Sequence, residues 1–274
     1  MTTLGTLSIH LDGSPCKVGC AWCYLGARRA TEGGGERFHL PILSDVLGRL
    51  GYEEVAVAVS EPLAEAEPQL RAIVAAARGL VTVTTTPQLA RRALAGELFA
   101  GVGRVNLSID SWKGVVEPPA VEALAAALKS RWPGLEVVLI ATLDSPEFAK
   151  KLVSAGLLEA LVDLPAVDKV ALNALKPPPA WCDRRWWMGA LAQLRGLLER
   201  ELDKRLFLDC WVAARLLGLG GCPGRADLSP AAGGLAFRGC VYQPAAEAVV
   251  AGADELGRVL DGWAPPAECP FPIR

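Results

Sequence analysis

Apolar residues along the chain fall into short continuous runs that alternate with stretches of helical periodicity. The runs are rich in Val, Ile, Leu and Thr and end at Gly or Pro, which is typical of buried strands in a parallel sheet. Six runs predict strands: TLSIHLDG at 6–13, EEVAVAVSEP at 53–62, LVTVTTTP at 80–87, RVNLSIDSW at 104–112, LEVVLIATL at 135–143 and DKVALNALKP at 168–177. The stretches that separate or follow them predict helices over Leu43–Leu50, Glu65–Arg78, Gln88–Ala100, Pro119–Arg131, Pro146–Ala155 and Arg184–Lys204.

This alternation predicts an α/β fold in which right-handed crossovers join parallel strands. Tandem β-α units form either an open sheet or a barrel, and both place chemistry beyond the carboxyl ends of the strands. Beyond Phe207 the pattern gives way to a segment rich in Gly and Pro, which is followed by a predicted helix over Ala245–Trp263. We therefore expect a main domain over 1–205 and a small cysteine-containing module over 206–274.

Polar residues follow the predicted strands at the points where a ligand would bind. After the first strand comes a loop with three cysteines, and the later strands are followed by Ser60-Glu61-Pro62, Thr84-Thr85-Thr86, Ser108 and Asp110, and Asn173 and Lys176. A simpler interpretation is that such residues stop strands and cap the helices that come next. The pattern alone leaves both interpretations open.

Composition narrows the class of protein. The 274 residues are 51% hydrophobic, but the uncharged runs are far shorter than the roughly 20 residues that cross a bilayer. The amino terminus has neither a basic region nor a long apolar one, so we expect a cytoplasmic protein without a membrane partner. The net charge of −2 and the pI near 5.8 make long nucleic acids unexpected partners.

The loop after the first strand, CKVGCAWCYLG, holds Cys16, Cys20 and Cys23 within eight residues. Thiolates bind soft metals, and three of them can converge on one ion or cluster. A structural zinc site needs a fourth ligand, and neither His10 nor His39 has the paired spacing that would supply it. A disulfide would leave one thiol unexplained. An iron–sulfur cluster is the favoured interpretation, and zinc, a disulfide or inert thiols stay open.

These residues resemble the signature of the radical S-adenosylmethionine enzymes, CxxxCx(aromatic)C after the first strand. Cys16, Cys20 and Cys23 match its cysteines and Trp22 its aromatic position. The family's GGEP motif after strand two is similar to 59–62, with Val59 and Ser60 in place of the two glycines. The resemblance implies a partial (β/α)6 TIM-type barrel.

The same resemblance implies a set of cofactors and contacts. Cys16, Cys20 and Cys23 would hold a site-differentiated [4Fe–4S] cluster, whose fourth iron binds S-adenosylmethionine. Further contacts to S-adenosylmethionine would come from Ser60, Glu61 and Pro62 at the methionine amine, from Ser108 and Asp110 at the ribose, and from Trp22 near the adenine. The expected partners are a reduced electron donor such as ferredoxin or flavodoxin and a peptide or small-molecule substrate.

The tail resembles the auxiliary-cluster modules called SPASM and twitch, because Cys222 and Cys240 bracket Gly234. This resemblance implies a second [4Fe–4S] cluster held by Cys210, Cys222, Cys240 and Cys269. A disulfide between Cys222 and Cys240 is the main alternative. Cys182 has no partner in the sequence and is interpreted as an ordinary thiol.

The resemblance predicts an enzyme that cleaves S-adenosylmethionine reductively and abstracts hydrogen from its substrate through a 5′-deoxyadenosyl radical. A glycyl-radical-type activase that acts on a partner protein is an alternative within this class. A non-catalytic binding protein stapled by zinc or a disulfide is an alternative of another class.

One further stretch, 181–187, combines three tryptophans with Arg184 and Arg185. Packing of a helix against the sheet is its usual meaning. An edge that binds acids or stacks on a substrate is the second hypothesis.

Overall fold

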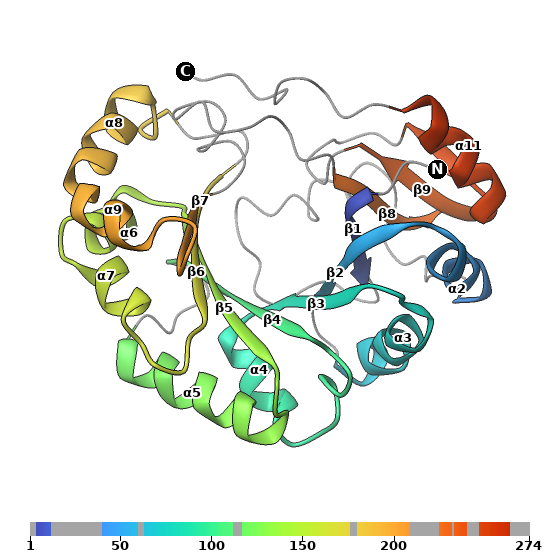
Figure 1. The fold of residues 1–274 in the computed structure, drawn as a ribbon, viewed down its shortest axis with the longest axis horizontal. Helices are drawn as coiled ribbons and strands as arrows, with labels where there is room; N and C mark the ends of the chain where they lie inside the picture. The colour runs from blue at the N-terminus through green and yellow to red at the C-terminus, as the bar shows by residue number, and fades with distance from the viewer. Residues whose placement is uncertain are drawn as a thin grey trace. The chain divides into compact units, whose positions relative to one another are not determined.

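The computed structural model describes residues 4–11, 40–59, 63–111, 117–175, 180–208, 225–231, 233–239 and 247–263. Strands and helices alternate through most of this range, as Figure 1 shows. The fold class is therefore α/β with a mostly parallel sheet, and this part of the sequence prediction is confirmed. Within the described ranges, none of the helices is both long and apolar enough to cross a membrane.

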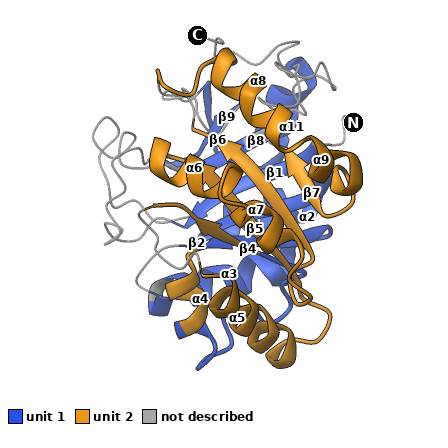
Figure 2. Ribbon diagram, turned by 90° about the vertical axis from the view of Figure 1, so that its left-hand side faces the viewer, with its two compact units in different colours: residues 1–85, 92–105, 223–265 blue, residues 86–91, 106–222, 266–274 orange. Residues whose placement is uncertain are grey.

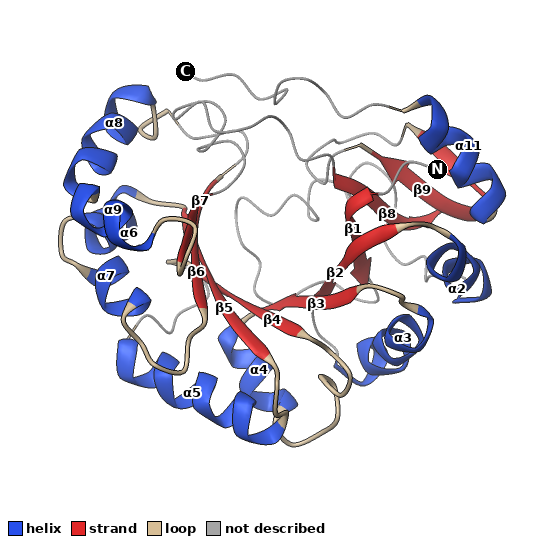
Figure 3. Ribbon diagram, viewed as in Figure 1, coloured by secondary structure: helices blue, strands red, loops and turns tan. Residues whose placement is uncertain are grey.

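The chain divides into two units, which Figure 2 colours separately. Unit 1 comprises residues 1–85, 92–105 and 223–265, and unit 2 comprises residues 86–91, 106–222 and 266–274. Each unit contains strands with helices on one side of its sheet (Figure 3).

The unit 1 sheet has the strand order β10-β9-β8-β1-β2-β3. Its strands are β1 (Leu4–Leu11), β2 (Tyr52–Val59), β3 (Leu80–Thr85), β8 (Arg225–Ala231), β9 (Gly234–Arg238) and β10 (Ala248–Val250). Parallel pairing joins β8, β1, β2 and β3, whereas β9 runs antiparallel to both β8 and β10. The helices of this unit are α2 (Leu40–Arg49), α3 (Leu63–Ala76) and α11 (Ala253–Gly262).

Unit 2 contains β4 (Arg104–Ile109), whose first two residues belong to unit 1, followed in sheet order by β5 (Glu136–Leu143), β6 (Lys169–Ala174) and β7 (Leu206–Leu208). The β6 strand pairs in parallel with both β5 and β7. The helices are α5 (Pro118–Arg131), α6 (Pro146–Val153), α7 (Leu157–Val162), α8 (Arg184–Gln193) and α9 (Arg195–Glu201), and α4 (Pro87–Ala93) begins in this unit.

Alternation of side chains builds the core of each unit. Successive residues of a strand point to opposite faces, so one face can be entirely apolar. In unit 1 this face carries Leu7, Ile9, Val55 and Val57, all of them without exposed surface. In unit 2 it carries residues of the same kind, with Leu107, Val137, Leu139, Val170 and Leu172 fully buried. The helices cover these apolar faces.

All six predicted strands are present, and α7 and β7 to β10 are additional elements. The helix boundaries differ most in three places. The helix predicted over Gln88–Ala100 ends at Ala93. The single helix predicted over Arg184–Lys204 is two helices, α8 and α9, that meet at Leu194. The helix predicted over Ala245–Trp263 begins only at Ala253, because Ala248–Val250 forms β10 instead.

The segment after Phe207 contributes strands and a helix to unit 1. Ala226, Asp227 and Leu228 of β8 pair with Leu7, Ser8 and Ile9 of β1. On the helix side, the backbone N–H of Ala253 donates to Asp45 Oδ2 at 3.1 Å, and Arg49 of α2 pairs with Asp254 of α11. The hydrogen bond to Asp254 raises the pKa of the Arg49 guanidinium above its ordinary value. The cysteine-containing module is not shown by these residues, and the domain boundary at 205/206 stays a prediction.

The aromatic core under β9 gives a test of this arrangement. Phe237 has no exposed surface, and its ring meets that of Trp263 edge to face with 5.9 Å between centroids. We expect Phe237→Ala to lower the free energy of unfolding by about 3–5 kcal/mol, because it leaves a cavity in the core. The matched control is Val249→Ala on the neighbouring strand, where half of the side chain is exposed and the change should stay within about 0.5 kcal/mol. Urea titration followed by circular dichroism measures both. Equal, small losses would show that β9 is not packed into the unit 1 sheet.

Candidate functional site

The face of the unit 1 sheet opposite the apolar one carries polar side chains. Ser8 and His10 occupy this face in β1, since they alternate with Leu7 and Ile9. The strand register places Ser8 opposite Asp227 of β8, and Asp227 opposite Arg238 of β9. The first strand of the chain and the hairpin of β8 and β9 near its end therefore present polar groups on the same face.

The carboxylate of Asp227 lies between a histidine and an arginine. His10 Nε2 is 2.8 Å from Asp227 Oδ1, and Arg238 Nη1 is 3.8 Å from Asp227 Oδ2. The same Nη1 atom donates a hydrogen bond to Ser229 Oγ at 2.7 Å. Asp227 and Arg238 have no exposed surface and His10 has 4%. We call His10, Asp227, Ser229 and Arg238 the His10 cluster.

Burial of the His10 cluster raises the free energy of the folded protein unless the charges of the cluster compensate each other. An isolated carboxylate or guanidinium in the protein interior loses several kcal/mol of hydration free energy. A buried ion pair is also weak evidence for stability, because apolar residues of similar volume often stabilise a core as well or better. The inner positions of a packed barrel are usually filled by branched apolar side chains. The His10 cluster therefore has the composition of a functional site rather than of a core.

Small side chains lie beside His10 on the same face. The register places His10 opposite Ala58 of β2, and Ala58 opposite Thr84 of β3. Both Ala58 and Thr84 are half-buried, although they lie inside the sheet. The side chain opposite His10 on β2 is therefore only a methyl group.

A second group of polar residues lies at the carboxyl ends of the unit 2 strands. Ser108 and Asp110 are buried at the end of β4, with 8% and 0% of their surface exposed. Ser111 donates to Asp144 Oδ2, which follows β5, both from its hydroxyl and from its backbone N–H at 3.1 Å. The ends of β4 and β5 are thus joined through a carboxylate, while the predicted ligand roles of Ser108 and Asp110 stay predictions.

The capping interpretation of strand-end residues holds at one of the predicted positions. Thr86 Oγ1 accepts from the backbone N–H of Leu89 at 3.2 Å, in the first turn of α4. Thr85 Oγ1 donates to the carbonyl of Val59 at 3.3 Å and so joins β3 to β2. The hydroxyls of Thr85 and Thr86 are therefore engaged in local structure.

Most of the predicted site residues lie outside the described residues. This holds for the candidate metal ligands Cys16, Cys20, Cys23, Cys210, Cys222, Cys240 and Cys269, and for Trp22, Ser60, Glu61 and Pro62. Cys182 is described and is buried. Within the ranges that the structure describes, no group of three or more His, Cys, Asp or Glu side chains is placed to hold a metal ion.

Comparison with known proteins finds similar solved structures only at low identity. No family model and no curated protein matches the chain. The structure titled "PhdJ bound to substrate intermediate" is similar with 18% identity and a TM-score of 0.43, over 79% of this chain and 64% of that one. N-acetylneuraminate lyase (sialic acid aldolase) from Aliivibrio salmonicida is similar with 12% identity and a TM-score of 0.42, over 80% of this chain and 68% of that one. The chain thus spans less than two thirds of PhdJ.

These findings correct the family prediction made from the cysteine motif. Two of the similar structures are, by their titles, a sialic acid aldolase and the N-terminal domain of a putative aldolase, and the identification as a radical S-adenosylmethionine enzyme is wrong against the similar structures. The [4Fe–4S] clusters, S-adenosylmethionine, radical chemistry and SPASM or twitch module that the resemblance implied are withdrawn with it. The physical reason is that closely spaced thiols can bind several soft metals, so their spacing does not identify the group that is bound.

Sequence reasoning did not find the His10 cluster. His10 was considered only as a zinc ligand, because no second histidine stands near it in the sequence, and Asp227 and Arg238 lie in the segment assigned to an appended module. One signal was available: Thr6, Ser8 and His10 alternate with leucine and isoleucine, which indicates a strand with one polar face.

The charge balance of the cluster can be tested by stability. We expect Arg238→Met to lower the free energy of unfolding by about 3–5 kcal/mol, because the carboxylate of Asp227 stays buried without its guanidinium neighbour. The double variant Asp227→Leu/Arg238→Met should recover most of this loss. Arg258→Met, at an exposed position of α11, is the matched control and should change stability by about 0.5 kcal/mol or less. A double variant as unstable as the single one would show that Asp227 and Arg238 are not coupled.

Proposed function

We propose that the protein is an enzyme that transfers a proton to or from a small carbonyl compound, with His10 as the acid–base group. The observation that carries the proposal is the buried contact of 2.8 Å between His10 Nε2 and Asp227 Oδ1 on a polar sheet face. A carboxylate at one ring nitrogen orients an imidazole and stabilises its protonated form. The second nitrogen, Nδ1, is then the atom that exchanges the proton with the substrate.

The other members of the His10 cluster act on Asp227 and not on the substrate. Arg238 lies beside the second carboxylate oxygen of Asp227, and Ser229 accepts a hydrogen bond from Arg238. An ionised Asp227 is required, because a neutral carboxylic acid would stabilise the imidazolium less. The sequence of contacts thus runs from Ser229 through Arg238 and Asp227 to His10.

The neighbourhood of His10 indicates the substrate class. We infer that a small molecule binds beside Ala58, which presents only a methyl group next to His10 on the polar face. A carbonyl group acidifies the protons on the neighbouring carbon, so a histidine can act on them as a general base. His10 would take that proton, the electron pair would move onto the carbonyl oxygen to form an enolate, and the proton would return to carbon.

We also propose that the sheet forms a partial barrel. In doubly wound sheets helices cover both faces, whereas in barrels they cover only the outer one. The helices of each unit lie on one side of its sheet (Figure 3), and in unit 1 the other side is the polar one. This supports a partial (β/α) barrel with its ligand site on the inner face, and a small molecule rather than a long polymer as the substrate.

The space beside His10 gives a first test. We expect Ala58→Leu to abolish binding of small carbonyl compounds, because its side chain fills that space. Ala75→Leu, at an exposed position of α3, is the matched control and should bind like the parent protein. Ligand-observed NMR with pyruvate, 2-oxoglutarate and dihydroxyacetone phosphate as probes measures the effect. The site would be excluded if Ala58→Leu still binds every probe that the parent protein binds. It would also be excluded if the parent protein binds none of them.

Proton transfer itself gives a second test. For any probe that binds, the carbon-bound hydrogens next to its carbonyl should exchange in D2O, and 1H NMR follows the loss of their signals. We expect His10→Gln to slow this exchange by about 10²-fold or more while the probe still binds, as for removal of a general base. Asp227→Asn should slow it as well, since the imidazole loses its orienting carboxylate. An unchanged exchange rate in His10→Gln would exclude the acid–base role.

A further inference from the structure

The polar face of unit 1 continues from His10 towards the amino ends of the strands. On this face β2 presents only methyl groups, those of Ala56 and Ala58, which alternate with buried valines. The strand register places Ser8 of β1 on one side of Ala56 and Thr82 of β3 on the other. Two side chains with hydroxyl groups therefore flank a methyl group. We call Ser8, Ala56 and Thr82 the Ala56 row.

The three residues of the Ala56 row differ in exposure. Ala56 is half-buried, although paired strands lie on both sides of it. Ser8 has 7% of its surface exposed and Thr82 has none. The apolar face of β2 is covered by helices, so the exposed surface of Ala56 belongs to the polar face. A ligand can thus approach the row over the methyl group of Ala56.

The hydroxyl group of Thr82 carries the argument. Its Oγ1 atom is buried and has no hydrogen-bond partner among the residues that the structure describes. A buried hydroxyl without a partner raises the free energy of the folded state, and buried polar groups in native proteins nearly always have a partner. A valine would have the same shape without this cost. The hydroxyl therefore indicates a partner that a ligand supplies.

The charges next to the row favour a neutral group as that partner. The carboxylate of Asp227 lies opposite Ser8 on the adjacent strand and would repel an anion. Arg238 lies on the far side of Asp227, because β8 separates β9 from β1. A hydroxyl group both donates and accepts, as Ser8 and Thr82 do themselves. The row is therefore suited to a hydroxyl group rather than to a carboxylate or a phosphate.

We infer that the Ala56 row binds a hydroxyl group of the substrate and so determines its specificity. The inference rests on the proposed acid–base role of His10 and narrows its substrate to small hydroxylated carbonyl compounds. Ser8 precedes His10 by two residues on the same face, which is about 7 Å along a strand. The hydroxyl group must therefore lie several bonds away from the carbonyl. Ser8 and Thr82 contact the substrate but take no part in proton transfer.

Three ketones that differ at one end test the inference. One is 5-hydroxypentan-2-one, hexan-2-one has a methyl group in place of its hydroxyl, and levulinate ends in a carboxylate. We expect 5-hydroxypentan-2-one to bind about tenfold more tightly than hexan-2-one, because hydrogen bonds of a buried hydroxyl contribute on that scale. Levulinate should bind no more tightly than hexan-2-one. Ligand-observed NMR measures the three Kd values.

The variant Thr82→Val distinguishes a ligand contact from a structural role. It should raise the Kd for 5-hydroxypentan-2-one about tenfold and remove the preference over hexan-2-one. The loss should fall on the Kd and not on the rate of hydrogen exchange in D2O at saturation. The urea midpoint should not fall, because the described residues offer Thr82 Oγ1 no hydrogen bond to lose. Ser8→Ala should weaken binding of the same ketone.

Thr85→Val is the matched control on the same strand. Thr85 is also buried, but it lies on the opposite face and its hydroxyl donates to the carbonyl of Val59. This variant should lower the urea midpoint and leave the Kd for 5-hydroxypentan-2-one unchanged. The two threonine variants are therefore expected to show opposite patterns.

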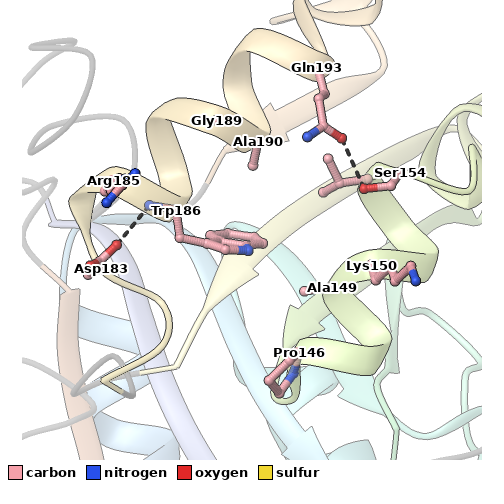
Figure 4. Close-up of a pocket in the computed structure, with 11 residues that line it drawn as sticks. Pro146, Ala149, Lys150, Ser154, Asp183, Arg185, Trp186, Gly189, Ala190 and Gln193 are labelled. Carbon is pink, nitrogen blue, oxygen red and sulfur yellow. Dashed lines mark hydrogen bonds between the residues drawn. The ribbon is translucent and has the colours of Figure 1, made fainter.

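A cavity in unit 2, between α6 and α8, provides a control for binding elsewhere. Its volume is about 540 Å³, and Figure 4 shows Trp186 extending into it, with Lys150 and Arg185 pointing apart on opposite sides of the ring. Trp187 has no exposed surface and takes the helix-packing role expected for this stretch. Gly189 lines the cavity and has open space at its Cβ position. Gly189→Leu fills this space and should leave the Kd for each ketone unchanged.

The possible failures can be told apart. If none of the ketones binds or exchanges, the proposed function and this inference are both wrong. If hexan-2-one binds and His10→Gln slows its exchange, but the hydroxyl group gives no tighter binding, only the inference is wrong. It is also wrong if Thr82→Val and Thr85→Val weaken binding equally, if Thr82→Val lowers the urea midpoint, or if Gly189→Leu abolishes binding.

Discussion

The arrangement of unit 1 depends on the contacts of the buried Asp227 carboxylate with His10 and Arg238. A carboxylate without exposed surface is stable in its ionised form only where neighbouring groups compensate its charge. His10 and Arg238 come from strands on either side of β8, so the compensation requires β1, β8 and β9 to pair in their observed register. A shift of β8 by one residue would turn Asp227 towards the apolar face and Leu228 towards the polar one.

The same alternation separates structural and chemical roles in both units. Leucine, isoleucine and valine on one face bury against helices and provide the hydrophobic stabilisation, which leaves the other face available for polar residues. Strand-end hydroxyls are divided between the two roles. Thr86 caps a helix and Thr85 joins two strands, whereas Thr84 lies on the polar face opposite Ala58.

The His10 cluster acts from a buried position. Its charges act through fixed geometry and a low local dielectric, an environment that is suited to acid–base chemistry.

The cysteine motif marks the limit of reasoning from local spacing. Three thiols within eight residues indicate a capacity to bind soft metals, and they suggested a family that the similar structures contradict. The prediction of a helix over Ala245–Trp263 was wrong in its first part for a related reason. The helix begins only at Ala253, because the backbone of Ala248–Val250 pairs with β9 as a strand.

The sequence by itself determined β1 to β6 and most helices, because apolar periodicity and helix-capping residues act over a few positions. It also determined which face of β1 is polar, through the alternation of Thr6, Ser8 and His10 with apolar residues. Only the tertiary structure decided that β8 pairs with β1, and therefore that Asp227 meets His10 across more than 200 positions of chain. Such pairing depends on the loss of hydration and the compensation of charge when distant segments are buried together, and no local pattern encodes it.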